Sequence, residues 1–280
     1  MITSTPPPGP AARLNKVLAA GRAEGRASLG LYLPVGYPNR KYSLETLRLI
    51  AGHADVVELG VPYSDSYLDG PVIQRAAKQA LAAGFGMKDL FTATATLTAA
   101  FPVAPLAVSY WAPIERYGPQ AFTAQFAATG GAGVRIIDLP DSAAPVWHAA
   151  TRAAGLHTIN MAPPHASSAR LADIGAATSG MIYVPATPGR TGVRRYLTPY
   201  LSRLVRRARE ATGLPVGAGI GISTAGQAAQ VARYADAVVV GSALIRQMSD
   251  HKDGPRCAAE VAREFAESVR QVSRLGCGIR

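Results

Sequence analysis

One carboxylate in this chain stands where its neighbours predict burial. Glu58 lies inside the apolar run 56–59, and Asp69 follows on a loop bounded by Gly and Pro. A buried carboxylate is costly to desolvate, so it commonly serves chemistry or pairs with a cation, and no Lys or Arg lies between residues 53 and 74. If Asp69 folds back over Glu58, the two acids can divide the roles of general acid and base. The alternative is a strand-end Glu that accepts hydrogen bonds from backbone amides.

The elements that must position these acids repeat along all 280 residues. Short apolar runs typical of strands covered on both faces alternate with helical patterns. Strands are expected at residues 28–33, 55–59, 104–109, 133–137, 157–161, 180–184, 215–218 and 237–240. Helices are expected at residues 44–52, 71–83, 87–100, 119–129, 142–154, 167–176, 199–212, 225–234, 242–248 and 257–275. Eight such units predict an α/β fold, a TIM (β/α)8 barrel in a single domain, with an open doubly wound sheet as the alternative.

The predicted barrel occupies residues 13–280, including a C-terminal helical segment. Residues 1–12, which contain several Pro and Thr, are expected to be a disordered lead-in rather than a secretory signal. No run of eighteen apolar residues is present, so no membrane span is expected. The two cysteines and five histidines lack the spacing of a metal site, and no disulfide framework is predicted, which favours the cytoplasm.

The formal net charge of +11 raises the question of nucleic-acid binding. Many arginines fall on amphipathic helical patterns, for example in residues 203–209 and 263–274, with no aromatic residues interleaved to stack on bases. We therefore expect a solvated basic surface that attracts anionic substrates, and no nucleic-acid partner.

The predicted strand ends place chemistry at one face of the barrel. Glu58 ends the second strand, and active sites of TIM barrels lie at the carboxyl ends of the strands. Glycine stretches at 217–223 and 241–243 follow the seventh and eighth strands, where backbone amides commonly hold a phosphate. A small-molecule phosphate substrate is therefore expected.

Two further features follow strand ends. The Gly- and Pro-rich loop 186–192 is long for a connector and predicts a lid over the ligand, with an ordinary connection as the alternative. Asp138 ends the fourth strand, where it either faces the pocket or caps the next helix.

The stretch Glu-Leu-Gly-Val-Pro-Tyr-Ser-Asp from Glu58, followed by Asp-Gly-Pro-Val-Ile-Gln from Asp69, resembles the second-strand signature of the tryptophan synthase α subunit family. Shorter matches occur at residues 36–38, 138–140, 191–192, 221–223 and 240–243. The resemblance implies a TIM barrel that cleaves indole-3-glycerol phosphate into indole and glyceraldehyde 3-phosphate, without metal or organic cofactor.

The resemblance also implies roles for single residues. Glu58 would deliver a proton to indole C3 and accept one from the glycerol hydroxyl, and Asp69 would bind the indole N–H and stabilise the protonated ring. Thr191 would hold Asp69 when the lid closes. The other substrate-binding residues would be Gly192, Gly221, Gly241 and Ser242 around the phosphate, and Tyr32, Val108, Tyr110 and Tyr183 around the indole.

Three departures from the usual family sequence concern the partner surface and the lid. Ser66 replaces a proline on the loop that touches the β subunit in the two-protein complex, and residues 110–116 lack the asparagines usual at that interface. The lid reads Thr-Pro-Gly-Arg-Thr-Gly in place of Arg-Ser/Thr-Gly-Val-Thr-Gly. We therefore expect a stand-alone lyase of specialised metabolism that releases indole or a substituted indole, and disfavour a β-subunit partner.

Three alternatives remain, the last of which is a related barrel that acts on a phosphate substrate by different chemistry. The first is a tryptophan synthase α subunit that depends on a β subunit. The second is a catalytically silent barrel that binds a ligand, against which the presence of both Glu58 and Asp69 argues.

Overall fold

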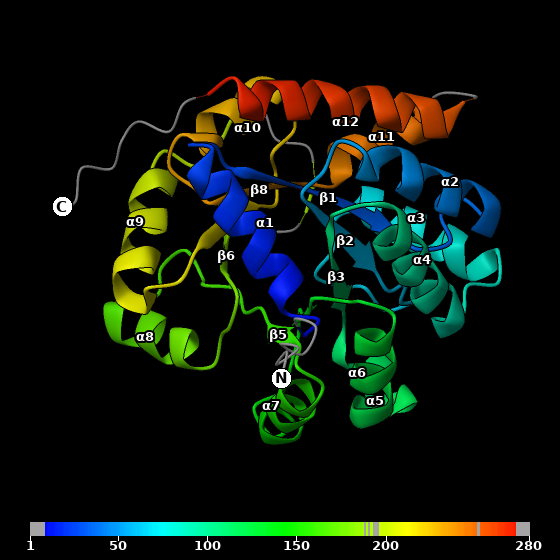
Figure 1. The fold of residues 1–280 in the computed structure, drawn as a ribbon, viewed down its shortest axis with the longest axis horizontal. Coiled ribbons are helices and arrows are strands. Elements are labelled where there is room, and N and C mark those ends of the chain that lie inside the picture. Colours follow the sequence, from blue (N-terminus) through cyan, green and yellow to red (C-terminus); the bar gives the residue numbers. More distant parts are fainter. Residues whose placement is uncertain (1–8, 188, 190, 193–195, 251–252, 273–280) are drawn as a thin grey trace, which may run out of the picture.

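Eight parallel strands form one sheet that curls into a barrel with helices outside it (Figure 1). The computed structural model describes residues 9–187, 189, 191–192, 196–250 and 253–272. The strands are β1 (Ser28–Pro34), β2 (Val56–Gly60), β3 (Ala104–Ser109), β4 (Gly133–Ile136), β5 (His157–Thr158), β6 (Ile182–Pro185), β7 (Val216–Gly219) and β8 (Ala237–Val240). Their order is β5-β4-β3-β2-β1-β8-β7-β6.

The seam between the first and last strands of this order is closed by backbone contacts. Met161, just beyond β5, forms a parallel bridge with Tyr183 of β6. The N–H of Ala162 donates to the Tyr183 carbonyl at 2.8 Å, and the N–H of Tyr183 donates to the Asn160 carbonyl at 3.0 Å. The predicted TIM barrel is therefore confirmed, and the open sheet is not observed.

The helices cover the outside of the sheet, and α12 packs on α2, α10 and α11 (Figure 1). They are α1 (Ala12–Ala23), α2 (Arg40–Ala51), α3 (Pro71–Ala82), α4 (Met87–Ala100), α5 (Trp111–Tyr117), α6 (Pro119–Ala128), α7 (Ala144–Ala153), α8 (Ser168–Ala176), α9 (Leu201–Thr212), α10 (Ala225–Ala232), α11 (Ser242–Asp250) and α12 (Gly254–Arg270). Of the expected lead-in, residues 1–8 lie outside the described residues, and Ala12 already begins α1.

Helix α1 is absent from the expected helices, and it closes the amino-terminal end of the barrel. Leu14, Val17 and Leu18 are buried at helical spacing. They pack against the first residues of several strands, including Val56 and Ala104, in one apolar cluster. The amino-terminal half of the barrel is therefore filled mainly by apolar side chains.

Helix α5 is the second element that is absent from the expected helices. The Asp138 carboxylate accepts a hydrogen bond from the backbone N–H of Trp111, the first residue of α5, at 2.6 Å. Asp138 thus supports a helix that precedes it in the chain, not the next helix. It does not line the main cavity at the strand ends.

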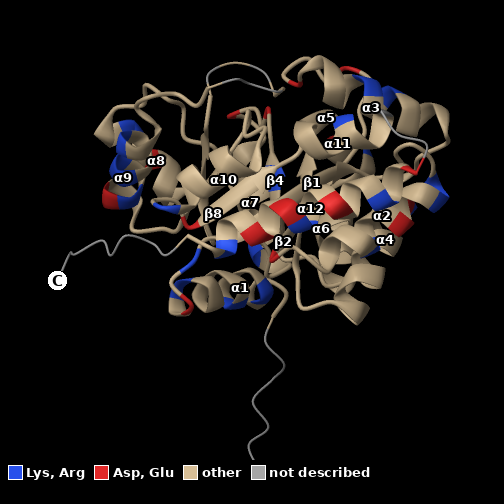
Figure 2. Cartoon of the chain, turned by 90° about the horizontal axis from the view of Figure 1, so that it is seen from above, with Lys and Arg blue, Asp and Glu red and all other residues tan. Residues whose placement is uncertain are grey.

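Basic side chains lie on outer helices such as α1 and α9 (Figure 2). Some of them pair along one helix, as Arg263 does with Glu267 at 3.0 Å in α12. The absence of a nucleic-acid partner stays a prediction. Among the described residues, no helix combines the length and apolar character that crossing a membrane would require.

Candidate active site

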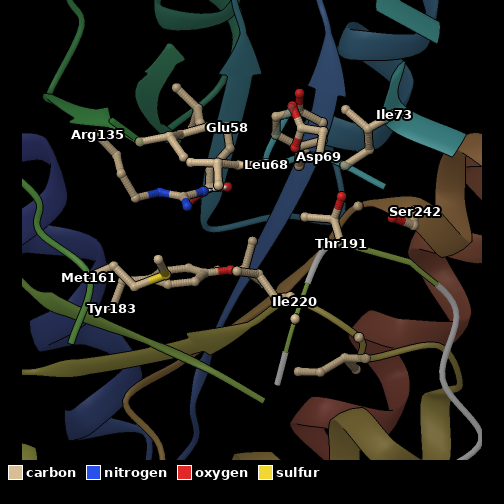
Figure 3. Close-up of a pocket in the computed structure, with 18 residues that line it drawn as sticks. Glu58, Leu68, Asp69, Ile73, Arg135, Met161, Tyr183, Thr191, Ile220 and Ser242 are labelled. Carbon is tan, nitrogen blue, oxygen red and sulfur yellow. Dashed lines mark hydrogen bonds and ion pairs between the residues drawn. The ribbon is translucent and has the colours of Figure 1, made fainter. Parts of the chain in front are cut away.

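A cavity of about 350 Å³ opens at the carboxyl ends of the strands. Figure 3 shows Arg135 and Met161 at one end of it, Ser242 at the other, and Glu58 and Asp69 in between. The predicted residues that line it are Tyr32, Glu58, Asp69, Val108, Tyr183, Thr191, Gly221, Gly241 and Ser242. Residues from far apart in the sequence thus meet at one site.

Two predicted residues do not line this cavity. Tyr110 lies behind Asp69, with its side chain 2% exposed, and its hydroxyl donates to the Asp69 carboxylate at 3.3 Å. The same hydroxyl accepts the N–H of Leu68 at 3.0 Å. Tyr110 therefore holds the acid-bearing loop rather than forming a wall. Gly192 also lies off the cavity wall, with open space where a Cβ would stand.

Glu58 projects from the middle of β2 and is 1% exposed. Its Oε2 accepts a hydrogen bond from Nη2 of Arg135 at 2.8 Å. Its Oε1 is buried and has no hydrogen-bond partner among the described residues. One oxygen is therefore held by a cation, and the other is free to meet a substrate atom.

Arg135 of β4 is the functional residue that the sequence reasoning missed. Its side chain is 10% exposed, and its guanidinium carbon lies 4.2 Å from the centre of the Tyr183 ring. In register it stands level with Val108 of β3, and it reaches across that strand to Glu58 of β2. The cation that pairs with Glu58 therefore comes from two strands away, not from the local sequence.

The remaining cavity residues that were not anticipated are mostly apolar. They are Leu68, Ile73, Ile137, Met161, Gly189, Ile220, Ile222 and Val239. Most of them follow strand ends, whereas Val239 lies within β8 and Ile73 within α3. Side-chain type alone does not distinguish a pocket wall from the core.

Asp69 lies on the loop after β2 and is 8% exposed. Burial raises the pKa of its carboxyl to about 6, against the opposing effects of the hydrogen bond from Tyr110, the charge of Arg135 and a hydrogen bond with Thr191. The two acids thus occupy different environments, because Glu58 has a cation in direct contact and Asp69 has neutral hydroxyls.

Two tyrosines form walls of the cavity because glycines leave room beneath them. A Cβ on Gly60 would lie 2.4 Å from the Tyr32 hydroxyl, and a Cβ on Gly219 would lie 1.7 Å from the Tyr183 hydroxyl. Burial raises the pKa of both tyrosines, so both side chains stay neutral and present apolar ring faces to a ligand.

The loop after β2 touches the loop after β6 closely at Gly70 and Thr191. The N–H of Gly70 donates to Oγ1 of Thr191 at 2.7 Å. A Cβ on Gly70 would lie 1.6 Å from the Thr191 carbonyl oxygen. Of the predicted lid, residues 188 and 190 lie outside the described residues, whereas Gly189 and Thr191 line the cavity.

The end of the cavity opposite Arg135 is built from backbone. Helix α11 begins at Ser242, and the first amides of a helix have no partner within it and attract anions. Ile220 and Gly221, after β7, have φ values of 62° and 93°, in the left-handed region. These backbone groups can surround a phosphate without supplying a charged side chain.

The family model of the tryptophan synthase alpha chain matches residues 18–274. The chain belongs to the tryptophan synthase alpha chain family. The alpha chain of Streptomyces avermitilis is 42% identical over 261 residues, which cover 92% of this chain and 94% of that one. The alpha chain of Thermobifida fusca is 42% identical over 268 residues, which cover 93% and 99%.

Solved structures agree with this membership. Mycobacterium tuberculosis tryptophan synthase superposes with a TM-score of 0.86 at 37% identity, covering 92% of this chain and 98% of that one. The tryptophan synthase alpha subunit of Legionella pneumophila superposes with a TM-score of 0.84 at 28% identity, covering 93% and 99%. The prediction of the family from the motif that begins at Glu58 is confirmed.

Members of the tryptophan synthase alpha chain family are carbon–carbon lyases, and so is this chain. The family reaction is the retro-aldol cleavage of indole-3-glycerol phosphate to indole and glyceraldehyde 3-phosphate. Alpha chains normally pair with a β subunit, and the M. tuberculosis neighbour is a structure of tryptophan synthase.

Proposed function

We propose that Glu58 and Asp69 carry out the retro-aldol cleavage in the cavity described above, and that the chain does so without a β subunit. The observation that carries the chemistry is the free Oε1 of Glu58, buried in a cavity that Asp69 also lines. The single-chain activity is supported by the contact between Gly70 and Thr191, which is made within this chain.

In the proposed reaction Glu58 moves both protons. It enters the reaction protonated and gives its proton to indole C3, which becomes tetrahedral; the resulting carboxylate then accepts the proton of the hydroxyl on the carbon bonded to C3. The bond between C3 and that carbon breaks, its electron pair returns to the ring to restore indole, and the carbon becomes the aldehyde of glyceraldehyde 3-phosphate. Because the proton lost by the hydroxyl balances the proton gained at C3, Glu58 ends in its starting state. Arg135 balances the negative charge of the carboxylate form of Glu58.

Asp69 supports the ring while it carries positive charge. Its carboxylate accepts the indole N–H, and the interaction strengthens as the protonated ring forms, as differential stabilisation requires. The hydroxyl of Tyr110 fixes the orientation of the carboxylate. Gly221, Gly241, Ser242 and, after closure of the lid, Gly192 are proposed to surround the phosphate.

The loop that carries Asp69 is tied down inside the chain. Ser66, which stands at the position of the usual proline, is 5% exposed. Its carbonyl accepts hydrogen bonds from the N–H of Asp69 and from the side chain of Gln74, both at 3.0 Å. These contacts support an acid that is positioned before any partner binds.

A chain that works alone releases free indole, which suits a specialised pathway that uses indole or a substituted indole. A cytoplasmic location is part of this proposal, because its anionic phosphate substrate does not cross membranes unaided. Family membership favours a second candidate, a true α subunit that becomes active on binding a β subunit.

Indole release separates the two candidates. The purified chain is given indole-3-glycerol phosphate with and without the β subunit of a relative such as that of S. avermitilis. Stand-alone function predicts rapid indole release that the β subunit changes by less than about 3-fold. Activation on the order of 10²-fold would instead establish the α subunit. Absence of indole under both conditions would refute the proposed reaction itself.

A further inference from the structure

Arg135 brings more hydrogen-bonding capacity into the cavity than Glu58 uses. A guanidinium carries five N–H donors, and the described residues accept one hydrogen bond from it, between Nη2 and Glu58. Its Nε is buried without a partner among those residues. Unpaired buried donors are uncommon in native proteins, so this group calls for an acceptor that the substrate supplies.

The position of Arg135 excludes the phosphate as that acceptor. Figure 3 shows Arg135 and Met161 at one end of the cavity, whereas Ser242, at the start of α11, lies at the other end. A substrate with its phosphate at Ser242 and its C3 at Glu58 therefore directs its six-membered ring toward Arg135.

A second cavity adjoins the first at this end. It measures about 340 Å³ and shares Arg135, Ile137 and Met161 with the first cavity. Asn160 and His148 also line it, and Nε2 of His148 is buried without a hydrogen-bond partner among the described residues. Space and one polar atom without a partner in the described part of the chain, Nε2 of His148, thus lie beyond the ring.

The two acids fix which edge of the ring faces Arg135. Ring position C4 lies on the C3 side of the six-membered ring, separated from C3 by C3a, and C7 lies on the N1 side, separated from N1 by C7a. Arg135 contacts Glu58, the group assigned to C3, at 2.8 Å, whereas Asp69, assigned to N1, is backed by Tyr110. The edge formed by C4 and C5 therefore faces the guanidinium.

We propose that Arg135 selects an indole-3-glycerol phosphate whose six-membered ring bears an uncharged oxygen substituent, a hydroxyl or alkoxy group, at C4 or C5. This rests on the proposed function, because it uses the placement of C3 at Glu58. The substituent is uncharged because the carboxylate that Glu58 becomes during the reaction balances the charge of Arg135. A second carboxylate in this buried site would be left without a counter-charge. The second cavity, lined by Asn160 and His148 among others, accommodates the side of the substituent oxygen that points away from Arg135.

The test runs the reaction in the direction of condensation. Glyceraldehyde 3-phosphate is supplied with indole or with 4-, 5- or 7-hydroxyindole, and the kcat/KM for each hydroxyindole is compared with that for indole. Because a hydrogen bond to a charged group is strong, the wild type should prefer 4- or 5-hydroxyindole over indole by about 10-fold or more, and should not prefer 7-hydroxyindole. Arg135→Met should reduce this ratio to about 1, while Arg152→Met, on the exposed face of α7, should leave it unchanged.

The outcomes distinguish a failure of this inference from a failure of the proposed function. If indole condenses and the hydroxyindoles react no better, or if Arg135→Met keeps the preference, the inference is wrong and the proposed function stands. If no indole condenses at all, the proposed function fails and the inference with it. If Arg135→Met is folded but inactive, calorimetry can measure the ratio of its affinities for indole-3-propyl phosphate and the 5-hydroxy derivative. If this affinity ratio equals that of the wild type, the inference is overturned.

Discussion

Replacing Gly70 with alanine tests whether the loops after β2 and β6 must meet for catalysis. The new Cβ would lie 1.6 Å from the Thr191 carbonyl oxygen, and because this oxygen belongs to the backbone, no side-chain rotation can relieve the contact. An ordinary contact requires about 2 Å more. The substitution therefore forces Thr191 away from Gly70 and breaks the hydrogen bond of 2.7 Å between them. Because Thr191 also hydrogen-bonds Asp69, the acid loses one of the contacts that orient it.

Misplacement of a catalytic group by about 1 Å can cost on the order of 10²-fold in rate, so we expect a loss of this size in kcat/KM for indole release. Gly86→Ala is the matched control. Gly86 also precedes a helix in extended conformation, at φ −134°, and a Cβ there would meet nothing within 4 Å. Both variants should melt within a few degrees of each other. If Gly70→Ala retains the activity of Gly86→Ala, the loop contact is not part of the active arrangement, and the argument for single-chain activity fails.

Other substitutions probe the two charged environments. Asp69→Asn should lower kcat on the order of 10²-fold, and the wild-type kcat/KM should fall as the pH drops below about 6, where Asp69 becomes protonated. A flat profile between pH 5 and 8 would contradict this. Because the folded-state pKa of Asp69 is raised, the fold binds more protons than the unfolded chain between about pH 4 and 6, so stability decreases as the pH rises through that window. Asp69→Asn should lack this loss, so in urea unfolding it should be about 3 kcal/mol more stable than the wild type at pH 8 but not at pH 4. An equal difference in stability at both pH values would refute this. Arg135→Met should lower the free energy of unfolding by about 3–5 kcal/mol at pH 7, because it leaves Glu58 unpaired. The double variant Glu58→Gln/Arg135→Met should recover part of this stability. A double variant no more stable than Arg135→Met would contradict the pairing.

The sequence was informative where local pattern decides structure. Nearly continuous apolar runs predicted the eight strands, and the motif from Glu58 predicted the family. Helix α1 was missed because its buried residues Leu14 and Val17 stand among polar and alanine residues in a segment judged by its Pro-rich beginning. Helix α5 was missed because its first residue, Trp111, is capped by Asp138, a partner that only the fold brings near.

The same limit explains the missed cation. Glu58 drew attention as a charged residue inside an apolar strand. Arg135 shows the same sequence pattern, because it stands between the apolar residues Val134 and Ile136. Their pairing depends on the order of strands in the barrel, which brings together residues 77 positions apart in the chain. A search for a second lone charge in any predicted strand would have found it, whereas a search between residues 53 and 74 could not.

The central claim is that the free oxygen of Glu58 moves protons for carbon–carbon cleavage. Steady-state indole release and calorimetric binding of indole-3-glycerol phosphate, measured on the wild type and on Glu58→Gln, test it directly. Glu58→Gln removes the proton carrier but keeps the shape, so binding should remain within about 10-fold while kcat falls by about 10³-fold or more. Indole release by Glu58→Gln within about 10-fold of the wild type would show that another group moves the proton.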